Sequence, residues 1–410
     1  MRPGCMRWID RNFGRPLCFL FTMYERSKGF FTRSAGGPSR DGKISSVLFI
    51  KLIEQGSSVF ASQAFEKAAA MAGRENLFCV VFRESRPILD ILDVFPPGNI
   101  IEIDPSTPLS FLMSSLKAIR AARKARVDAA VDMEFFARVS AILAYLSGAG
   151  KRAGLHTFKS EGPYRGDLFT HRIVYNPYMH ISRFFSMLVE ALGHEPPGDG
   201  SPMRFDLPED GFQAPSFAPG EDEKASLLAK IEKINGAPLS SPVFIFNPKT
   251  ADLLPARKWP AENYAALGQM IMKRHPGAAV IVTGPPSEIK DNLDIASSIG
   301  PGAFSLTGKT TLRELLTLFC LADVLVASDC GPAIFSAMTP LRSVVLFGPE
   351  SPSLYGIPGP GARVIYSRKI CSPCVNVYNH RQTACGNAVC MTDIRPRLVF
   401  EAVEGIIDGE

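Results

Sequence analysis

The sequence predicts an α/β protein made of two doubly wound, Rossmann-like domains that face each other across a cleft. Short apolar strands alternate with helical patterns from Val47 onwards, as is typical of a parallel sheet covered by helices on both faces. The alternation stops between Gly193 and Asp222, in a stretch rich in proline, glycine and acids, and then starts again. A chain of 410 residues with 46% hydrophobic residues is long enough for two cores.

We divide the chain into four parts along this pattern. Residues 1–40 are a basic and aromatic N-terminal segment, 41–205 a first Rossmann-like domain, and 206–235 a linker with a connecting helix. Residues 236–410 are a second Rossmann-like domain that carries a cysteine-rich loop at 371–390. Ligands of such folds bind beyond the carboxyl ends of the strands, so we look for site residues there.

Charge and hydropathy argue against two classes of protein. The net charge of +5 is small for this length and the basic residues are scattered, which disfavours nucleic-acid binding. No apolar run approaches the roughly 20 residues needed to cross a bilayer, so we do not expect an integral membrane protein. Because we find no export signal, we expect a cytoplasmic protein, with the inner face of the cytoplasmic membrane as a further location.

The N-terminal segment combines cations with large apolar side chains. It contains Arg2, Arg7, Arg11 and Arg15 among tryptophan, phenylalanine and leucine residues. One interpretation is an interfacial amphipathic helix, with basic groups on lipid phosphates and aromatic rings in the acyl boundary. The other is a helix that packs on the body of the protein. The sequence leaves both interpretations open.

Three strands of the second half end in turns that suit a phosphate group. A helical pattern follows each turn, and the start of a helix presents N–H groups and partial positive charge to an anion. These ends predict a nucleotide-sized site. Its candidate residues are Asn247, Lys249, Thr250, Gly284, Glu288, Asp329, Cys330, Gly331 and Pro332.

Arg257 and Lys258 follow the first of these strand ends, directly before Trp259. A cation there would neutralise a diphosphate, whereas the alternative is a solvated charge pair beside a packed tryptophan. Two common nucleotide motifs are absent from the sequence. GAFSLTGKT has one residue too many for a Walker loop, and no GxGxxG is present. We expect a helix cap at Thr310 or Thr311, with Glu314 completing a capping box.

In the first half, candidate residues follow two strands. Lys51, Glu54 and Ser57 lie where VLFIKL joins its helix. The Glu54 carboxylate is suited to take a proton from a hydroxyl, and Lys51 and Ser57 are candidates for acceptor contacts. The alternative is that Ser57 merely caps the helix and Glu54 is a surface acid.

The strand DAAVDM leads to Asp132 and Glu134, with Arg138 one helical turn later. We regard these residues as candidates for catalysis or acceptor contacts, since they too lie at a strand end. A Glu–Arg pair on a solvated helix is the alternative.

The C-terminal cysteines are Cys371, Cys374, Cys385 and Cys390, a CxxC pair followed by two wider-spaced thiols. Four thiolates would close a tetrahedral structural zinc site. The second pair lacks CxxC spacing, so free thiols or a redox-labile pair are competing interpretations.

As a set, these motifs resemble glycosyltransferase family nine, the heptosyltransferases of lipopolysaccharide biosynthesis. The similarity runs in order from Val47 to the C-terminus. It is carried by VLFIKLIEQGS, DAAVDMEFFARVSAILAYLSGAGKRAGL, FNPKTADLLPARKWPAENYAAL, VIVTGPPSE, LTGKTTLRELLTLFCLADVLVASDCGP, VVLFGPESP, the CSPC loop and MTDIRP.

The resemblance implies a GT-B architecture and inverting transfer that requires no metal. It also implies a nucleotide-sugar donor, ADP-heptose in the best-known members, in the C-terminal domain, and a lipopolysaccharide or related glycolipid acceptor in the N-terminal domain. Carried over by position, Thr250 and the Arg257–Lys258 pair contact the diphosphate, and Glu288 the nucleoside. Asp329 and Gly331 contact the donor sugar and phosphates.

Two positions depart from the family pattern. The family's Leu-Gly-Asp after the first strand, whose Asp is the expected base, is Gln55-Gly56-Ser57 here, and Ile334 replaces a histidine after Asp-x-Gly-Pro. The base is then Glu54, Asp132 or Glu134, or the chain binds its ligands without turnover. A nucleotide-sugar epimerase and a transferase with another donor are further alternatives.

Overall fold

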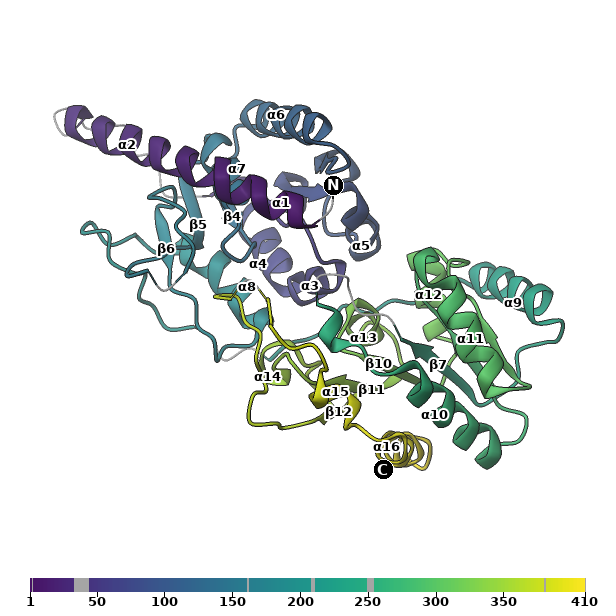
Figure 1. Ribbon diagram of the computed structural model, residues 1–410. Coiled ribbons are helices and arrows are strands. Elements are labelled where there is room, and N and C mark those ends of the chain that lie inside the picture. Colours follow the sequence, from purple (N-terminus) through teal and green to yellow (C-terminus); the bar gives the residue numbers. More distant parts are fainter. Residues whose placement is uncertain are drawn as a thin grey trace. The chain divides into compact units, whose positions relative to one another are not determined.

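The computed structural model describes residues 1, 3–32, 44–160, 162–207, 211–248, 254–379 and 381–409. The chain divides into two compact units, Met1–Gln213 and Ala214–Glu410, drawn in purple to teal and in green to yellow in Figure 1. Each unit contains a six-stranded sheet in which all paired strands are parallel. The predicted α/β class with two doubly wound sheets is therefore confirmed.

The sheet of the first unit has the strand order β3-β2-β1-β4-β5-β6. The chain starts at the centre, winds to one edge and then returns to wind to the other, so β1 and β4 are neighbours. Ile50 at the end of β1 lies opposite Asp132 at the end of β4. The strands are β1 (Val47–Ile50), β2 (Leu77–Phe82), β3 (Ile100–Ile103), β4 (Ala129–Asp132), β5 (Lys151–Leu155) and β6 (His171–Ile173).

Helices cover both faces of this sheet. One face packs on α6 and α7 through small residues such as Ala118, Ala122 and Ala141, and the other packs on α4 through Phe49 and Phe65. The helices are α1 (Pro3–Ile9), α2 (Arg15–Thr32), α3 (Gln55–Phe60), α4 (Ser62–Ala72), α5 (Arg86–Leu92), α6 (Pro108–Ala125), α7 (Arg138–Leu146) and α8 (Ile181–Glu190). A π-helical turn η1 (Asp10–Gly14) joins α1 to α2, and the short 3-10 turns are η2 (Arg74–Asn76), η3 (Arg83–Ser85), η4 (Pro97–Asn99) and η5 (Ala191–Gly193).

The sheet of the second unit repeats this winding, with the order β12-β11-β10-β7-β8-β9. Here β7 and β10 are the central neighbours, and Asn247 at the end of β7 lies opposite Ala327 of β10. Both sheets thus have the strand order of dinucleotide-binding folds. The strands are β7 (Val243–Asn247), β8 (Ala279–Val282), β9 (Ala303–Ser305), β10 (Val324–Ser328), β11 (Arg342–Phe347) and β12 (Ala362–Tyr366).

The core of the second unit is built on Trp259, Tyr264 and the apolar faces of its strands and helices. The predicted capping box is confirmed, because Thr311 and Glu314 satisfy each other's backbone N–H groups at the start of α12. The helices are α9 (Glu221–Asn235), α10 (Ala261–Arg274), α11 (Ile289–Ile299), α12 (Leu312–Phe319), α13 (Gly331–Ser336), α14 (Pro352–Tyr355), α15 (Val389–Thr392) and α16 (Pro396–Ile407), with 3-10 turns η6 (Pro255–Arg257) and η7 (Pro286–Glu288).

The helix that we predicted as part of a linker belongs to the second unit. Helix α9 packs on α12, where Lys230 lies 2.7 Å from Glu314 and Arg313 lies 2.5 Å from Glu223. The stretch rich in proline, glycine and acids before α9 suggested a connection, but charged side chains of α9 pair with α12.

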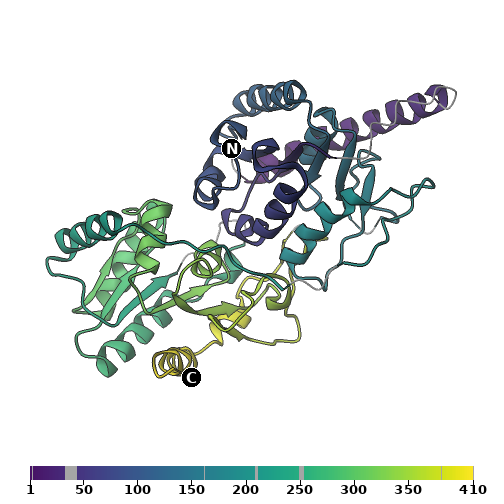
Figure 2. The same ribbon diagram turned by 180° about the vertical axis from the view of Figure 1, so that it is seen from behind.

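The N-terminal segment packs on the first unit as one continuous rod, α1, η1 and α2, which both Figure 1 and Figure 2 show along its outside. Asp10 Oδ1 accepts hydrogen bonds from the backbone N–H groups of Arg138 (2.8 Å) and Val139 (3.0 Å). A side chain of the rod thereby caps the start of α7. Packing on the body, one of the two interpretations left open, is therefore confirmed. No described helix is long and apolar enough to cross a membrane.

A pair of glycine substitutions tests the contact between the rod and α7. A Cβ at Gly14 would lie 2.8 Å from Cβ of Arg138, whereas one at Gly4 would meet nothing within 4 Å. We expect Gly14→Ala to lower the free energy of unfolding by about 1–3 kcal/mol, because an atom near the backbone has to move. Gly4→Ala should leave it unchanged or slightly higher, since alanine favours a helix. Urea unfolding of both variants measures the difference, and equal effects would contradict the contact.

Candidate functional sites

Each unit brings polar residues together where its two central strands end side by side. In the first unit these are the carboxyl ends of β1 and β4, and in the second those of β7 and β10. At such a switch in winding direction the connecting segments diverge, which leaves backbone groups available to a ligand.

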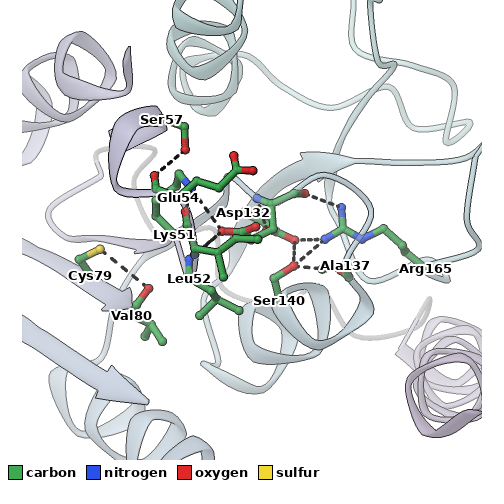
Figure 3. A network of polar contacts seen from close by, with 12 residues as sticks. Lys51, Leu52, Glu54, Ser57, Cys79, Val80, Asp132, Ala137, Ser140 and Arg165 are labelled. Atoms are coloured by element: carbon green, nitrogen blue, oxygen red, sulfur yellow. Dashed lines mark hydrogen bonds and ion pairs between the residues drawn. The ribbon is translucent and has the colours of Figure 1, made fainter. Parts of the chain in front are cut away.

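In the first unit, Glu134 organises the loop after β1, where Figure 3 labels Lys51 and Leu52. Its Oε1 accepts hydrogen bonds from the N–H groups of Leu52 (2.7 Å) and Ile53 (3.2 Å), and Lys51 Nζ lies 3.5 Å away. Lys51 also donates to the carbonyl of Ile53. Both charged side chains are buried, so this pair fixes the loop after β1.

Asp132 is fully buried and paired with Arg165 (Figure 3). Its Oδ1 accepts from the N–H of Glu134 (2.9 Å), and its Oδ2 from Ser140 Oγ (2.9 Å) and Arg165. Burial lowers the pKa of Arg165 to about 10, which still leaves the guanidinium charged at neutral pH. Both carboxylate oxygens are thus engaged inside the protein, as expected of a structural ion pair.

Sequence reasoning missed Arg165 because it lies in an irregular stretch, 33 residues from its partner. Its guanidinium also contacts the carbonyl oxygens of Leu155 (3.3 Å) and Glu134 (3.5 Å). No local pattern marks such a residue, and only the fold brings it to Asp132 at the end of β4.

Glu54 lies directly before α3 and is only partly buried. Its backbone adopts φ 66° and ψ 83°, a left-handed conformation that is uncommon for a residue with a side chain. Ser57 Oγ donates to the carbonyl of Glu54 at 2.8 Å, which holds this turn (Figure 3). Strained residues of this kind occur disproportionately at functional sites.

Arg138, a candidate for acceptor contacts, binds within the first unit instead of pairing with Glu134. Its guanidinium donates to Asp10 Oδ2 (3.0 Å) and to the carbonyl of Tyr164 (2.9 Å), and its side chain is nearly buried. This residue therefore ties the N-terminal rod to the body of the unit.

The second unit contains a pocket of about 310 Å³ at the carboxyl ends of its strands. It brings together five of the predicted donor residues and six that were not predicted as such. The former are Asn247, Gly284, Cys330, Gly331 and Pro332, and the latter Thr283, Pro285, Thr310, Thr311, Leu312 and Leu315.

Internal hydrogen bonds shape the floor of this pocket. Asn247 Nδ2 donates to the carbonyl (3.2 Å) and hydroxyl (3.0 Å) of Thr283. A Cβ at position 284 would lie 2.6 Å from Nδ2 of the buried Asn292, so a larger residue there would displace that amide. The same position would be 3.8 Å from Glu288 Oε2, so the Glu288 carboxylate lies close to the pocket wall.

Arg257 and Asp329 form an ion pair of 3.1 Å, with side chains only 12% and 7% exposed. Burial alone would lower the pKa of Arg257, but Asp329 and Glu350 outweigh it and raise that pKa. The structure thus brings together two residues that are 72 positions apart in the sequence. The alternative of a solvated charge does not hold for Arg257. It does hold for Lys258, which is 43% exposed and 3.8 Å from Asp291.

Glu350 and Arg381 were missed and belong to the same charged group. Glu350 is 1% exposed, and Arg381 Nε lies 3.3 Å from its Oε1. Glu350 follows β11 with two residues between, so the strand-end rule applied to the other strands would have found it. Lys249 and Thr250, two predicted donor residues, lie outside the described residues.

The four C-terminal cysteines lie in and after the loop that follows β12. Cys374 N–H donates to the carbonyl of Pro349 (3.0 Å), which anchors the loop next to Glu350. Burial and the neighbouring thiols raise the pKa of Cys390. In the described part of the chain, which omits His380, no three His, Cys, Asp or Glu side chains are grouped as metal ligands. Zinc therefore stays a prediction, which metal analysis of the purified protein tests.

Comparison with known families agrees with the motifs. A family model described as glycosyltransferase family 9 (heptosyltransferase) matches residues 115–384, about two thirds of the chain. The chain belongs to this family. Among curated proteins, the family 9 chain is similar to lipooligosaccharide heptosyltransferase 2 of Haemophilus ducreyi, at 28% identity over 52% of this chain and 59% of that protein. The Haemophilus influenzae enzyme of the same name is 26% identical over 32% and 38%. The match spans less than two thirds of either relative.

Solved structures show the same fold. One is the ADP-heptose LPS heptosyltransferase II of E. coli, with a TM-score of 0.66 and 19% identity over 88% of this chain and 98% of that one. Another is a family 9 glycosyl transferase of Veillonella parvula, with a TM-score of 0.67 and 16% identity over 89% and 98%. The GT-B type fold of the family 9 chain is thereby confirmed.

The Asp132–Arg165 pair makes a prediction about stability. Asp132→Ala leaves a buried guanidinium without its counter-charge, so we expect the free energy of unfolding to fall by about 3–5 kcal/mol. Adding Arg165→Leu should restore much of this loss, because the unpaired charge is then removed as well. Tyr178→Ala, at a side chain that is 89% exposed, is the control and should change stability by no more than about 0.5 kcal/mol. Urea unfolding measures all three, and a stable Asp132→Ala protein would contradict the structural role.

Proposed function

We propose that this family 9 chain is an inverting glycosyltransferase that moves a heptose from ADP-heptose onto a lipopolysaccharide core or a related glycolipid. In this proposal the second unit holds the donor and the first unit the acceptor. The observation that carries it is the buried Arg257–Asp329 pair beside a nucleotide-sized pocket, in a chain of this family. The names of the relatives support heptose and ADP as the donor groups.

The chemistry that we propose is a direct displacement. A carboxylate accepts the proton of an acceptor hydroxyl while its oxygen attacks the anomeric carbon, and the bond to the diphosphate breaks on the opposite face. The transition state is oxocarbenium-like, with negative charge gathering on the departing diphosphate. Arg257 is our choice to stabilise this charge, without a need for a metal ion, because it is held in place and shielded from water. Helix α13 has only six residues, so we assign its dipole a smaller part.

Among the three candidate carboxylates, the geometry favours Glu54 as the base. Asp132 is fully buried with both oxygens engaged, and Glu134 is nearly buried with two N–H groups on one oxygen. Glu54 is the partly exposed member of the three. It lies in the loop after β1, three residues before Ser57, which occupies the position of the family's usual base. The two buried acids are then positioning residues for this loop.

Substitution of Glu54 tests the base. A general base contributes about 10²–10⁴-fold in rate, so we expect Glu54→Gln to lower kcat by a factor in that range. The affinity for ADP should stay unchanged, since the second unit binds it. Ser57→Ala is the control at the position of the family's usual Asp, and we expect a small effect on kcat. Full activity of Glu54→Gln would exclude Glu54 as the base.

Substitution of Arg257 tests the diphosphate contact. A charge-assisted hydrogen bond contributes about 1.5–3 kcal/mol, so Arg257→Met should weaken ADP binding roughly ten- to a hundred-fold. Lys258→Met, at the exposed neighbour, should cost less, and Arg257→Lys should recover part of the affinity. Calorimetric titration with ADP measures these changes. A larger loss for Lys258→Met would contradict the assignment.

A binding protein without turnover is the second candidate, because Ser57 stands where the family has its aspartate. Incubating the purified protein with ADP-heptose, with and without a heptose-deficient core glycolipid, distinguishes a transferase, an epimerase and a binding protein. A glycolipid heavier by one heptose supports transfer, and its anomeric configuration decides inversion. A changed sugar in the absence of acceptor supports an epimerase, and binding alone supports the second candidate. Repeating the assay with other nucleotide sugars tests the donor.

A further inference from the structure

The N-terminal rod packs on the protein through a mainly small and polar side and carries most of its large apolar side chains on the side that faces away. The inward residues recur every three or four positions and are small or polar: Asp10, Gly14, Cys18, Thr22 and Glu25. Thr22 Oγ1 accepts from the N–H of Asp167 (2.8 Å), and Glu25 accepts from the hydroxyl of Tyr145 (2.7 Å). The contact with the body is thus made by hydrogen bonds and close backbone approach, and by Met6 and Phe21, which pack on the core of the first unit.

The outward face carries seven large apolar side chains that are 40–59% exposed: Trp8, Phe13, Leu17, Phe19, Leu20, Met23 and Tyr24. A helix on the surface of a globular protein normally buries such residues and exposes its polar ones. Full burial of one large apolar side chain stabilises a protein by about 1.5–3 kcal/mol, and none of these seven side chains is fully buried here. An apolar face of this extent marks a docking surface.

The charges on this face are positive. Arg7, Arg11 and Arg15 are exposed. Between residues 4 and 27 the acids are Asp10 and Glu25, and both are turned toward the body, where they hold α7. The exposed apolar side chains are therefore interspersed with cations and with no outward acid, which is the pattern of helices that lie in the interface of an anionic membrane.

Helix α6 repeats this combination. Leu109, Leu112, Met113 and Leu116 form an exposed stripe at helical spacing, followed by exposed Lys117, Arg120, Arg123 and Lys124. The helix contains no acid. It packs on the same face of the sheet as Cys18 of the rod, in one core cluster. The terminal amine of Met1 is hydrogen-bonded to the carbonyl oxygens of Pro105 (2.5 Å) and Ser106 (3.0 Å), just before α6.

We propose that these outward residues of the rod and of α6 form a membrane-docking surface for an anionic phospholipid bilayer. The apolar side chains enter the acyl boundary and the cations bind the lipid phosphates, without crossing the bilayer. The cations also argue against a second copy of the chain as the occupant, because two such faces would bring like charges together. Docking does not depend on the proposed function, although it would bring the enzyme to a glycolipid acceptor.

Vesicle flotation of the full chain, without donor or acceptor, tests this proposal separately from catalysis. We expect binding to vesicles that contain phosphatidylglycerol, much weaker binding to pure phosphatidylcholine, and a decrease with added salt. Phe19→Ser with Leu20→Ser, and separately Arg11→Glu with Arg15→Glu, should each lower the partition coefficient about tenfold or more. Leu112→Ser with Met113→Ser should lower it as well.

The control is Tyr178→Ser with Ile370→Ser, two exposed apolar residues outside this surface, which should bind vesicles like the unmodified chain. All the changed side chains are exposed, so we expect each variant to fold, and thermal unfolding checks this. Wild-type binding by the rod variants would overturn the proposal, and unchanged binding by the α6 variant would remove α6 from the surface. If the unmodified chain is a dimer that dissociates in the rod variants, a second copy of the chain covers this surface and the proposal of a bilayer is wrong.

Discussion

The reversal of winding at the centre of each parallel sheet is the constraint on which the candidate sites depend. It brings the ends of β1 and β4, and of β7 and β10, next to each other, so that polar groups far apart in sequence meet at one edge. Groups that meet there are taken out of water and require partners. The charged networks around Glu134 and around Arg257 follow from this requirement.

The two networks meet it differently. In the first unit the charges are satisfied internally, because Asp132 is paired with Arg165 and Glu134 accepts backbone N–H groups. Such a network fixes the loop after β1 and leaves Glu54 at its partly exposed end. In the second unit Arg257 faces both Asp329 and Glu350 and keeps its charge beside a pocket. The first arrangement suits positioning, whereas the second is the one to which we assign the diphosphate in the proposed function.

Two peripheral elements also contact these networks. Asp10 of the rod caps α7, the helix that also supplies Ser140 to Asp132. In the second unit the cysteine loop supplies Arg381 to Glu350. A surface that we propose for lipid and a loop that we predict for zinc are therefore each one element away from a candidate site.

The sequence by itself determined the doubly wound sheets, the strand-end candidates and the capping box of Thr311 and Glu314, because these depend on local periodicity and on backbone groups that need a nearby partner. It also placed Arg257 next to a strand end. Only the tertiary structure decided that Arg165 neutralises Asp132, that Arg138 binds the rod instead of Glu134, and that the rod exposes its apolar side. These outcomes depend on which elements pack together across long sequence separations, and no local pattern specifies that.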